Sequence, residues 1–258
     1  MTTTRRARPH VPMSMHDVTV TQVQPLTPHL TRITFRSPSL ADLADDGPDQ
    51  RFKLLLPRPG QQRPLLPDGG ANWYAQWQQM PEHERPVLRT YTIRHYRPEA
   101  GEVDVDFVLH GDSGPASAWA SRAKAGDRVG IYGAYADYDP PPDADWQLIV
   151  GDDTALPAIG AILDRSRLPS SVFVEVARAQ DRIDLPVEVT WLHRDVGDTL
   201  LDAIRKIELP DGRPYAWVAG ESAAVQAIRR HLVHDRAVPR ESITFTGYWR
   251  LDGPVDPN

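Results

Sequence analysis

The chain has 258 residues, no cysteine and a formal net charge of −6 at pH 7. Without cysteine there is no disulfide framework, no thiolate metal site, no cysteine-ligated iron–sulfur cluster and no cysteine nucleophile. The negative charge argues against non-specific binding of DNA or of anionic membranes as the main role. No run approaches the ~18 consecutive apolar residues of a membrane span. The arginine pair near the start, Arg5-Arg6, is not followed by the apolar run of a secretion signal, so we expect a cytoplasmic protein.

The first half of the chain is typical of a β-structure. Short alternating runs bounded by Pro, Gly or Asp predict six strands, which could close a small antiparallel barrel. The Pro/Gln/Trp-rich segment 57–86 predicts loops with a short helix at 73–79. The six expected strands cover residues 18–20, 30–35, 52–56, 88–93, 103–109 and 128–132.

The hydrophobic period changes after a segment that holds three consecutive prolines and four aspartates. Strands then alternate with helices, which predicts a parallel sheet with helical crossovers. The expected strands are 147–150, 171–177, 189–193, 215–219 and 243–246, and the expected helices are 156–167, 199–207 and 221–237. We therefore expect a six-stranded antiparallel barrel over residues 14–134, a proline-rich linker over 135–145 and an α/β domain over 146–251.

The sequence Arg89-Thr90-Tyr91-Thr92-Ile93-Arg94 lies on one of the expected strands. Alternation puts Arg89, Tyr91 and Ile93 on one face of it. An arginine can bind a pyrophosphate bidentately, and a tyrosine ring can lie on a flat heterocycle. A threonine hydroxyl can bond a ring heteroatom, so the group suits a flavin dinucleotide. An amphipathic strand with solvated arginines explains the same spacing equally well.

A Gly/Ser-rich turn, running from His110 to Ala120, follows the next strand and opens a short helix. Pro115 suits the first helical position, and the free amides of a helix start attract phosphate. A plain strand–turn–helix capped by Ser113 is the alternative.

Two further groups lie in the second half. Gly151-Asp152-Asp153-Thr154-Ala155 ends the first strand of the α/β part, where such sheets bind ligands. It is not a G-x-G-x-x-G loop, and two carboxylates would repel a pyrophosphate. Helix capping by Asp153 or Thr154 is at least as good an explanation as dinucleotide binding. Tyr248-Trp249-Arg250 follows the last strand and either returns to the site or forms an exposed aromatic tail.

With these four groups in order, the chain resembles the siderophore-interacting proteins, which are FAD-dependent ferric-siderophore reductases. RTYTIR resembles the family's R-x-Y-T-x-R, and VDFVLHGDSGPASAWA, GDDTALPAI, the Gly220-Glu221 strand end and GYWR resemble its later blocks. The resemblance runs from about residue 14 to 251.

The resemblance implies a specific site. FAD would contact one set of residues from the barrel and another from the α/β half, with no catalytic side chain and no metal ligand. Lys53 and Arg250 would bind the anionic ferric chelate, and a third basic contact is missing where AYADYDPPP follows Gly133. The implied FAD-binding residues are Arg89, Tyr91, Thr92, His110, Gly114, Ala116, Ser117, Trp119, Asp153, Thr154, Ala155, Tyr248 and Trp249.

The implied reaction is reduction of a ferric siderophore, with release of iron in the cytoplasm. Hard oxygen ligands hold Fe(III) far better than Fe(II), so one electron unlocks the chelate. NAD(P)H or reduced ferredoxin would donate the electrons, and the Asp152/Asp153 pair argues for a poor dinucleotide site. Nucleic acid is not an expected partner.

Three other functions fit parts of the sequence. The first is a flavin reductase or electron-transfer enzyme with a non-iron acceptor, which would not need Lys53. The second is a protein that binds siderophore without reducing it. The third is a metal-dependent enzyme using His231 and His234, for which the ordinary explanation is a pair on a helix surface.

Overall fold

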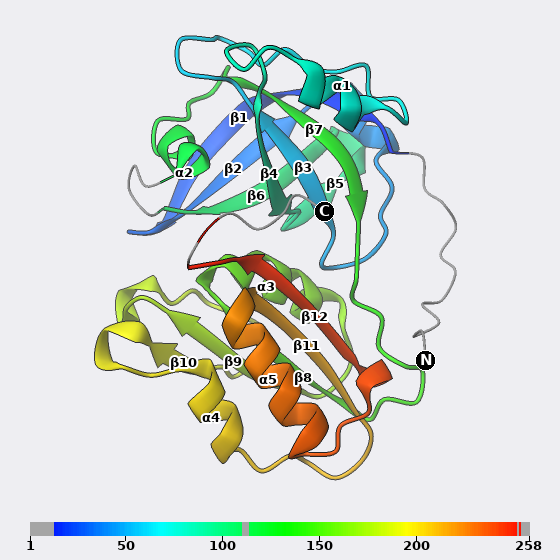
Figure 1. Ribbon diagram of the computed structural model, residues 1–258, viewed down its shortest axis with the longest axis vertical. Coiled ribbons are helices and arrows are strands. Elements are labelled where there is room, and N and C mark those ends of the chain that lie inside the picture. The colour runs from blue at the N-terminus through cyan, green and yellow to red at the C-terminus, as the bar shows by residue number, and fades with distance from the viewer. Residues whose placement is uncertain (1–12, 110–113, 252, 254–258) are drawn as a thin grey trace. The chain divides into compact units, whose positions relative to one another are not determined.

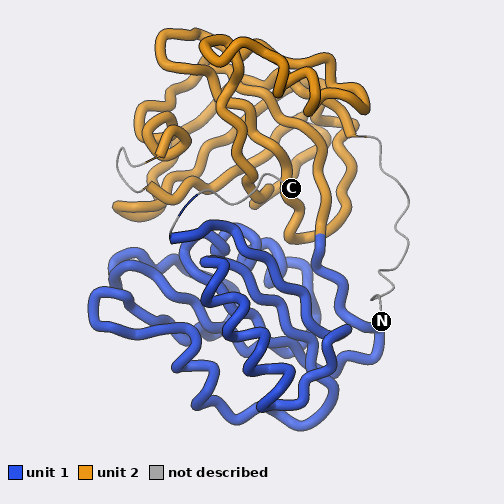
Figure 2. Tube along the Cα trace, viewed as in Figure 1, with its two compact units in different colours: residues 1–6, 137–258 blue, residues 7–136 orange. Residues whose placement is uncertain are grey.

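The structure is a computed structural model that describes residues 13–109, 114–251 and 253. The chain divides into two compact units: one ends at Ala136, and the other begins at Asp137 (Figure 2). Among the described residues, no helix is long and apolar enough to cross a membrane.

The first unit is an antiparallel sheet of seven strands in the order β4-β3-β7-β1-β2-β6-β5 (Figure 1). Its edge strands β4 and β5 follow one another in the chain. Between them, the Ile93 backbone N–H donates to the Gln50 carbonyl at 2.9 Å and the Arg94 N–H donates to the Asp104 carbonyl at 2.8 Å. Neighbouring residues thus bond to opposite edges, and the sheet curls into a barrel. The strands are β1 (Met15–Thr27), β2 (Leu30–Arg36), β3 (Arg51–Leu56), β4 (Val87–Thr92), β5 (His95–Arg97), β6 (Glu102–Val108) and β7 (Arg128–Tyr135).

The predicted count of six strands was wrong by one. The additional strand, β5, is only three residues long and reads His-Tyr-Arg. It has no apolar alternation, so the sequence carries no strand signal for it. Its pairing with β6 along Glu102–Asp104 is what makes it a strand.

The barrel has a hydrophobic core inside and a smaller apolar cluster outside. Phe35, Phe52 and Phe107 are among the fully buried core residues. On the outer face of β3, β4 and β7, Trp73 packs on Tyr132 with ring centroids 4.2 Å apart. Trp73 begins α1 (Trp73–Gln79), the short helix predicted in the 57–86 segment. That segment is therefore anchored to the barrel wall by its own apolar contacts.

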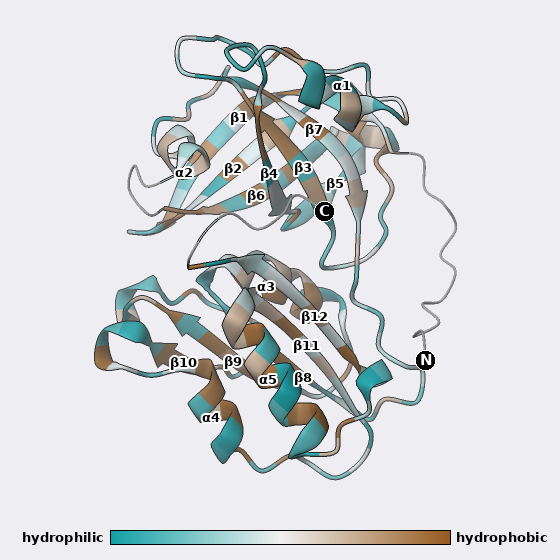
Figure 3. Cartoon of the chain, in the orientation of Figure 1, coloured by the Kyte–Doolittle hydropathy of each residue, from teal (hydrophilic) through white to brown (hydrophobic). Residues whose placement is uncertain are grey.

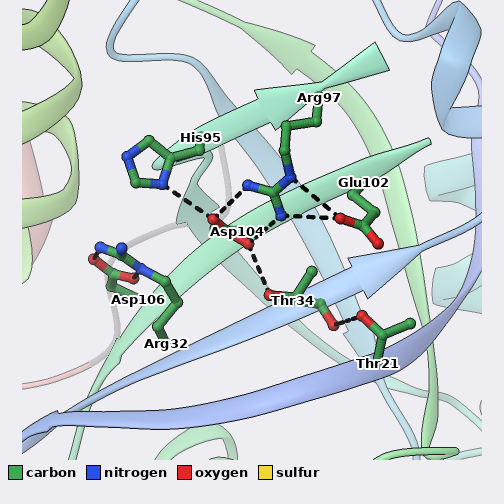
Figure 4. A network of polar contacts seen from close by, with 8 residues as sticks. All are labelled: Thr21, Arg32, Thr34, His95, Arg97, Glu102, Asp104 and Asp106. Carbon is green, nitrogen blue, oxygen red and sulfur yellow. Dashed lines mark hydrogen bonds and ion pairs between the residues drawn. The ribbon is translucent and has the colours of Figure 1, made fainter. Parts of the chain in front are cut away.

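A network of ionised side chains covers the outer face of β2, β5 and β6 (Figure 4). Asp104 is buried and accepts two hydrogen bonds from Arg97, at 2.7 and 2.8 Å. It also accepts one from the Thr34 hydroxyl at 2.8 Å, and its carboxylate lies 3.0 Å from the His95 ring nitrogen Nδ1. Burial by itself would raise the pKa of Asp104, but these hydrogen bonds outweigh it and hold the pKa well below the usual range.

The second unit is a parallel sheet of five strands, as the alternating pattern predicted, and their order is β10-β9-β8-β11-β12. Along α5, Val225, Ile228 and Leu232 form the predicted buried face, and the helix also carries hydrophilic residues (Figure 3). The elements are β8 (Trp146–Asp152), α3 (Leu156–Arg165), β9 (Ser170–Val176), β10 (Thr190–His193), α4 (Leu200–Lys206), β11 (Pro214–Glu221), α5 (Ser222–His234) and β12 (Ile243–Trp249).

The strand order fixes where this sheet can hold a ligand. β8 is followed in the chain by β9 on one side, whereas its other neighbour is β11. The order reverses between β8 and β11, and ligands of open α/β sheets bind outside the carboxyl ends of the strands at such a reversal. Asp152 and Glu221, the last residues of these two strands, lie at that point.

Candidate functional site

The two faces of β4 separate as predicted. Tyr91 packs against the barrel core with its ring 4.4 Å from that of Phe107, and Arg89 lies exposed on the same face. Burial raises the pKa of Tyr91, so its hydroxyl stays protonated at physiological pH. Thr92 is buried on the opposite face. Because β4 is an edge strand, a ligand lying along it can reach side chains of both faces.

The short helix α2 (Pro115–Ala120) lies against β4 and β6, with Pro115 in its first turn as predicted. Trp119 stacks on Phe35, with the ring centroids 6.2 Å apart and the planes at 18°. The N-cap residue is Gly114, and a Cβ atom added there would have no heavy atom within 4 Å. Ala116 and Ser117 are buried in the first turn. The predicted contact at His110 lies outside the described residues.

These residues fit a flavin dinucleotide. An exposed guanidinium at Arg89 can meet a pyrophosphate, and the aromatic ring of Tyr91 can meet a flat heterocycle. The described residues leave a Cβ position at Gly114 free of neighbours within 4 Å, so they do not obstruct an anion at the start of α2. All of them belong to one unit, around β4 and α2.

Lys53 is a buried cation on β3. Its Nζ atom donates to the Thr90 hydroxyl at 3.0 Å, and no described carboxylate forms an ion pair with it. Burial, assisted by the charge of Arg51, lowers the pKa of Lys53 below that of an ordinary lysine. A buried cation with only a neutral partner is costly, and an incoming anion would offset that cost.

In the second unit, Asp152 is the centre of a buried hydrogen-bond cluster. Its carboxylate accepts hydrogen bonds from Thr154, from the Glu221 backbone and from the Trp249 indole. The helix cap predicted at Asp153 or Thr154 is therefore provided by Asp152, which accepts from the Thr154 N–H at 3.0 Å. Asp152 can cap this turn because its carboxylate, at the end of β8, lies within hydrogen-bond distance of the Thr154 N–H as well as of Glu221 and Trp249.

Asp153 forms an ion pair with Arg194, which also contacts Glu175 at 3.4 Å. The charge of Asp153 is thus partly neutralised, and the Asp152/Asp153 pair is less repulsive than two free carboxylates. Arg194 follows β10, 41 residues further along the chain than Asp153, and no local pattern in the sequence could have paired them. Ala155 is fully buried behind this segment.

The end of β12 meets the Asp152 cluster through Trp249. The Ser222 hydroxyl donates to the Trp249 carbonyl at 3.0 Å, and Tyr248 lies edge-on to Trp217 with ring centroids 6.5 Å apart. Arg250 is exposed. Of the predicted residues in this unit, the structure therefore brings Asp153, Thr154 and Trp249 around one carboxylate.

The described residues contain no group of three or more His, Asp or Glu side chains that could hold a metal ion. His231, in α5, forms a hydrogen bond at 2.8 Å with Asp235, the residue that caps the end of this helix.

Comparison with known proteins identifies the family of this chain. Residues 19–137 match the siderophore-interacting FAD-binding domain, and residues 144–252 match the siderophore-interacting protein domain. The chain is 32% identical over 236 residues to the ferric vibriobactin reductase ViuB of Vibrio cholerae, covering 86% of this chain and 84% of that protein.

Two crystal structures are similar over nearly the whole chain. A siderophore utilization protein from T. fusca has a TM-score of 0.81 at 30% identity, covering 95% of this chain and 96% of that one. The siderophore-interacting protein SipS from Aeromonas hydrophila has a TM-score of 0.73 at 32% identity, covering 93% and 99%. The chain belongs to the siderophore-interacting protein family, with its FAD-binding domain in the first half.

Proposed function

We propose that this protein reduces ferric siderophores with bound FAD and releases Fe(II) in the cytoplasm. Its family and the ferric reductase activity named for a relative support this function. The single observation that carries the substrate class is Lys53, a buried cation with a hydroxyl as its only described polar partner. An anionic iron chelate would supply the missing negative charge.

The protein's residues bind and orient, and the cofactor supplies the redox chemistry. When bound, FAD accepts two electrons and passes them on one at a time, which suits Fe(III). We assign Arg89 and Gly114 to the pyrophosphate, and Tyr91 to a face of the isoalloxazine ring. Lys53 holds the anionic chelate by charge. No nucleophile or general acid is needed, because no covalent bond to carbon is broken.

The proposal predicts a yellow protein whose reduced form yields Fe(II) from a ferric chelate. Purified protein is loaded with FAD, reduced anaerobically, and mixed with a ferric siderophore in the presence of a coloured Fe(II) trap. We expect the visible flavin band to return as the Fe(II) complex forms, at two Fe(II) per flavin. A folded protein that ignores added FAD would refute the assignment. Reoxidation without Fe(II) would point to a non-iron acceptor.

For the electron donor, we propose reduced ferredoxin rather than NAD(P)H. Carboxylates already accept hydrogen bonds from the starts of α4 and α5 and from the 3-10 turn before α3, although α3 itself has no side-chain cap. Asp152 accepts from Thr154 before α3, Glu175 accepts from the Leu200 N–H of α4 at 3.1 Å, and Glu221 accepts from two N–H groups of α5 at 2.7 and 2.9 Å. A dinucleotide pyrophosphate would have to displace these anions from the amides it needs.

Stopped-flow bleaching of the flavin tests this choice of donor. We expect reduced ferredoxin to bleach the flavin at least about 10-fold faster than NADH or NADPH at equal concentration, because the capped amides cost a dinucleotide at least ~1.4 kcal/mol of binding. Glu221→Gln, which removes one capping charge, should reduce the difference between the bleaching rate with ferredoxin and the rate with NADH or NADPH. Rapid bleaching by NADH in the unmodified protein would show that a dinucleotide is the donor.

A further inference from the structure

One carboxylate ties together the ends of three parallel strands. The Asp152 Oδ2 atom accepts hydrogen bonds from the Glu221 backbone N–H and from the Trp249 indole Nε1–H, each at 2.8 Å. Its Oδ1 atom accepts from the backbone N–H and the hydroxyl of Thr154. Four donors from β11, β12 and the segment after β8 therefore converge on one side chain.

Only an ionised carboxylate satisfies all four donors, because a carboxylate accepts on both oxygens and donates from neither. An asparagine at this position would present its own N–H groups to donors. Yet burial, with the neighbouring Asp153 charge, raises the pKa of Asp152 to about 6. The fold thus keeps a charge where charge is disfavoured, which is characteristic of functional positions.

The surrounding backbone is shaped to this contact. Gly220 has a φ of +144°, and a Cβ atom there would lie 2.5 Å from Asp152 Oδ2. The backbone of Trp249 is held separately, since its carbonyl accepts from the Ser222 hydroxyl at 3.0 Å. The bond from Asp152 therefore constrains the indole ring, while the strand end has its own tether.

We propose that Asp152 is a positioning residue, which fixes the indole ring of Trp249 through the Nε1–H hydrogen bond and thereby sets the orientation of a ring that the family resemblance assigns to FAD binding. The orientation of the Trp249 ring follows from the hydrogen bond alone. The consequence of that orientation for turnover rests on the proposed function. Asp152 itself touches neither cofactor nor substrate in this role.

The constraint depends on pH. The charged groups that face Asp152 are Asp153, Glu175, Glu221 and Arg194, and Asp153 is already paired with Arg194. Protonation of Asp152 removes the negative charge that strengthens the bonds from all its donors. The hydrogen bond from the Trp249 indole is therefore charge-assisted above about pH 6 and weaker below it.

The indole ¹H–¹⁵N resonance of Trp249, identified by its absence in Trp249→Phe, tests the proposal without any bound cofactor. We expect this resonance to titrate with a midpoint near pH 6, and to lose both the titration and its protection from solvent exchange in Asp152→Asn. The matched control, Asp211→Asn on an exposed aspartate, should leave it unchanged. An unchanged Trp249 resonance in Asp152→Asn would overturn the proposal.

A second arm covers the case in which Asp152→Asn does not fold. Trp249→Phe removes one donor, so the Asp152 carboxyl, followed by ¹³C shift, should titrate at higher pH than in the unmodified protein; an unchanged titration would refute the contact. In turnover we expect each variant to lower kcat about 10-fold and the double variant to lose no more than either. If the resonances behave as expected but the unmodified protein reduces no ferric chelate, the proposed function fails and the role of Asp152 stands.

Discussion

Replacing Lys53 by methionine is expected to lower kcat/KM for an anionic ferric chelate by about 10- to 100-fold. Methionine keeps the length of the side chain and removes its charge. A close unit-charge attraction near a protein surface is worth up to about 4 kcal/mol, and solvent around the chelate reduces that figure. Because Lys53 has no described counter-ion, its charge is available to the substrate. Steady-state rates on an anionic and a neutral ferric chelate give the comparison.

Measurements of FAD binding and of stability separate a loss of substrate attraction from a general loss of function in Lys53→Met. FAD binding should not change, and stability should be kept or increased, because the variant no longer buries a cation. Lys124→Met, on an exposed lysine of the same unit, is the control and should leave the rate unchanged. Equal loss on the neutral chelate would argue against a charge-based role, and full activity would favour an acceptor other than a ferric siderophore.

Lys53 also predicts a pH dependence. Its lowered pKa means that the protonated form is lost earlier on the alkaline side than for an ordinary lysine. The preference for the anionic over the neutral chelate should therefore fall at a pH below the usual lysine value of about 10.4. The same decline should be missing in Lys53→Met.

Replacing Asp104 by asparagine is expected to destabilise the barrel by about 1.5–3 kcal/mol. The change removes charge-assisted hydrogen bonds at a buried position, while Arg97 keeps its pairing with Glu102. Glu102→Gln is the matched control in the same network: Glu102 is more exposed, pairs only with Arg97, and its loss should cost under about 1 kcal/mol. Urea denaturation, monitored through the hydrogen exchange of barrel amides, measures the change in the free energy of unfolding for both variants.

The contribution of Asp104 to the free energy of unfolding should depend on pH in the acid range. Its pKa is lower in the folded than in the unfolded chain, so its contribution is present above the unfolded value of about 3.9 and is lost as the pH falls towards the folded pKa. Unmodified protein should therefore lose stability steeply below about pH 4, and Asp104→Asn should lose less. Equal costs for the Asp104 and Glu102 variants would show that burial does not strengthen the network.

The strand and helix pattern of this protein was largely readable from its sequence. Alternating runs predicted six of the barrel strands, and the change of period after residue 145 predicted the alternating strands and helices of a parallel sheet. These features are local, because the period of apolar residues reflects which face of a strand or helix is buried. The two faces of β4, with Arg89 and Tyr91 together, followed from the same rule.

What the sequence could not decide depends on contacts between distant segments. β5 became a strand because β6 was there to pair with it. Asp152 and Asp153 looked alike in the sequence, but one is a buried acceptor for Trp249, 97 residues away, and the other pairs with Arg194. Only the family resemblance pointed to Lys53 in the sequence, and its burial is visible only in the structure. The sequence by itself determined the helices, the strands and the motifs of the family. Only tertiary packing decided which charged side chains are buried and which partners compensate them, because burial and the distance to a partner are properties of the fold.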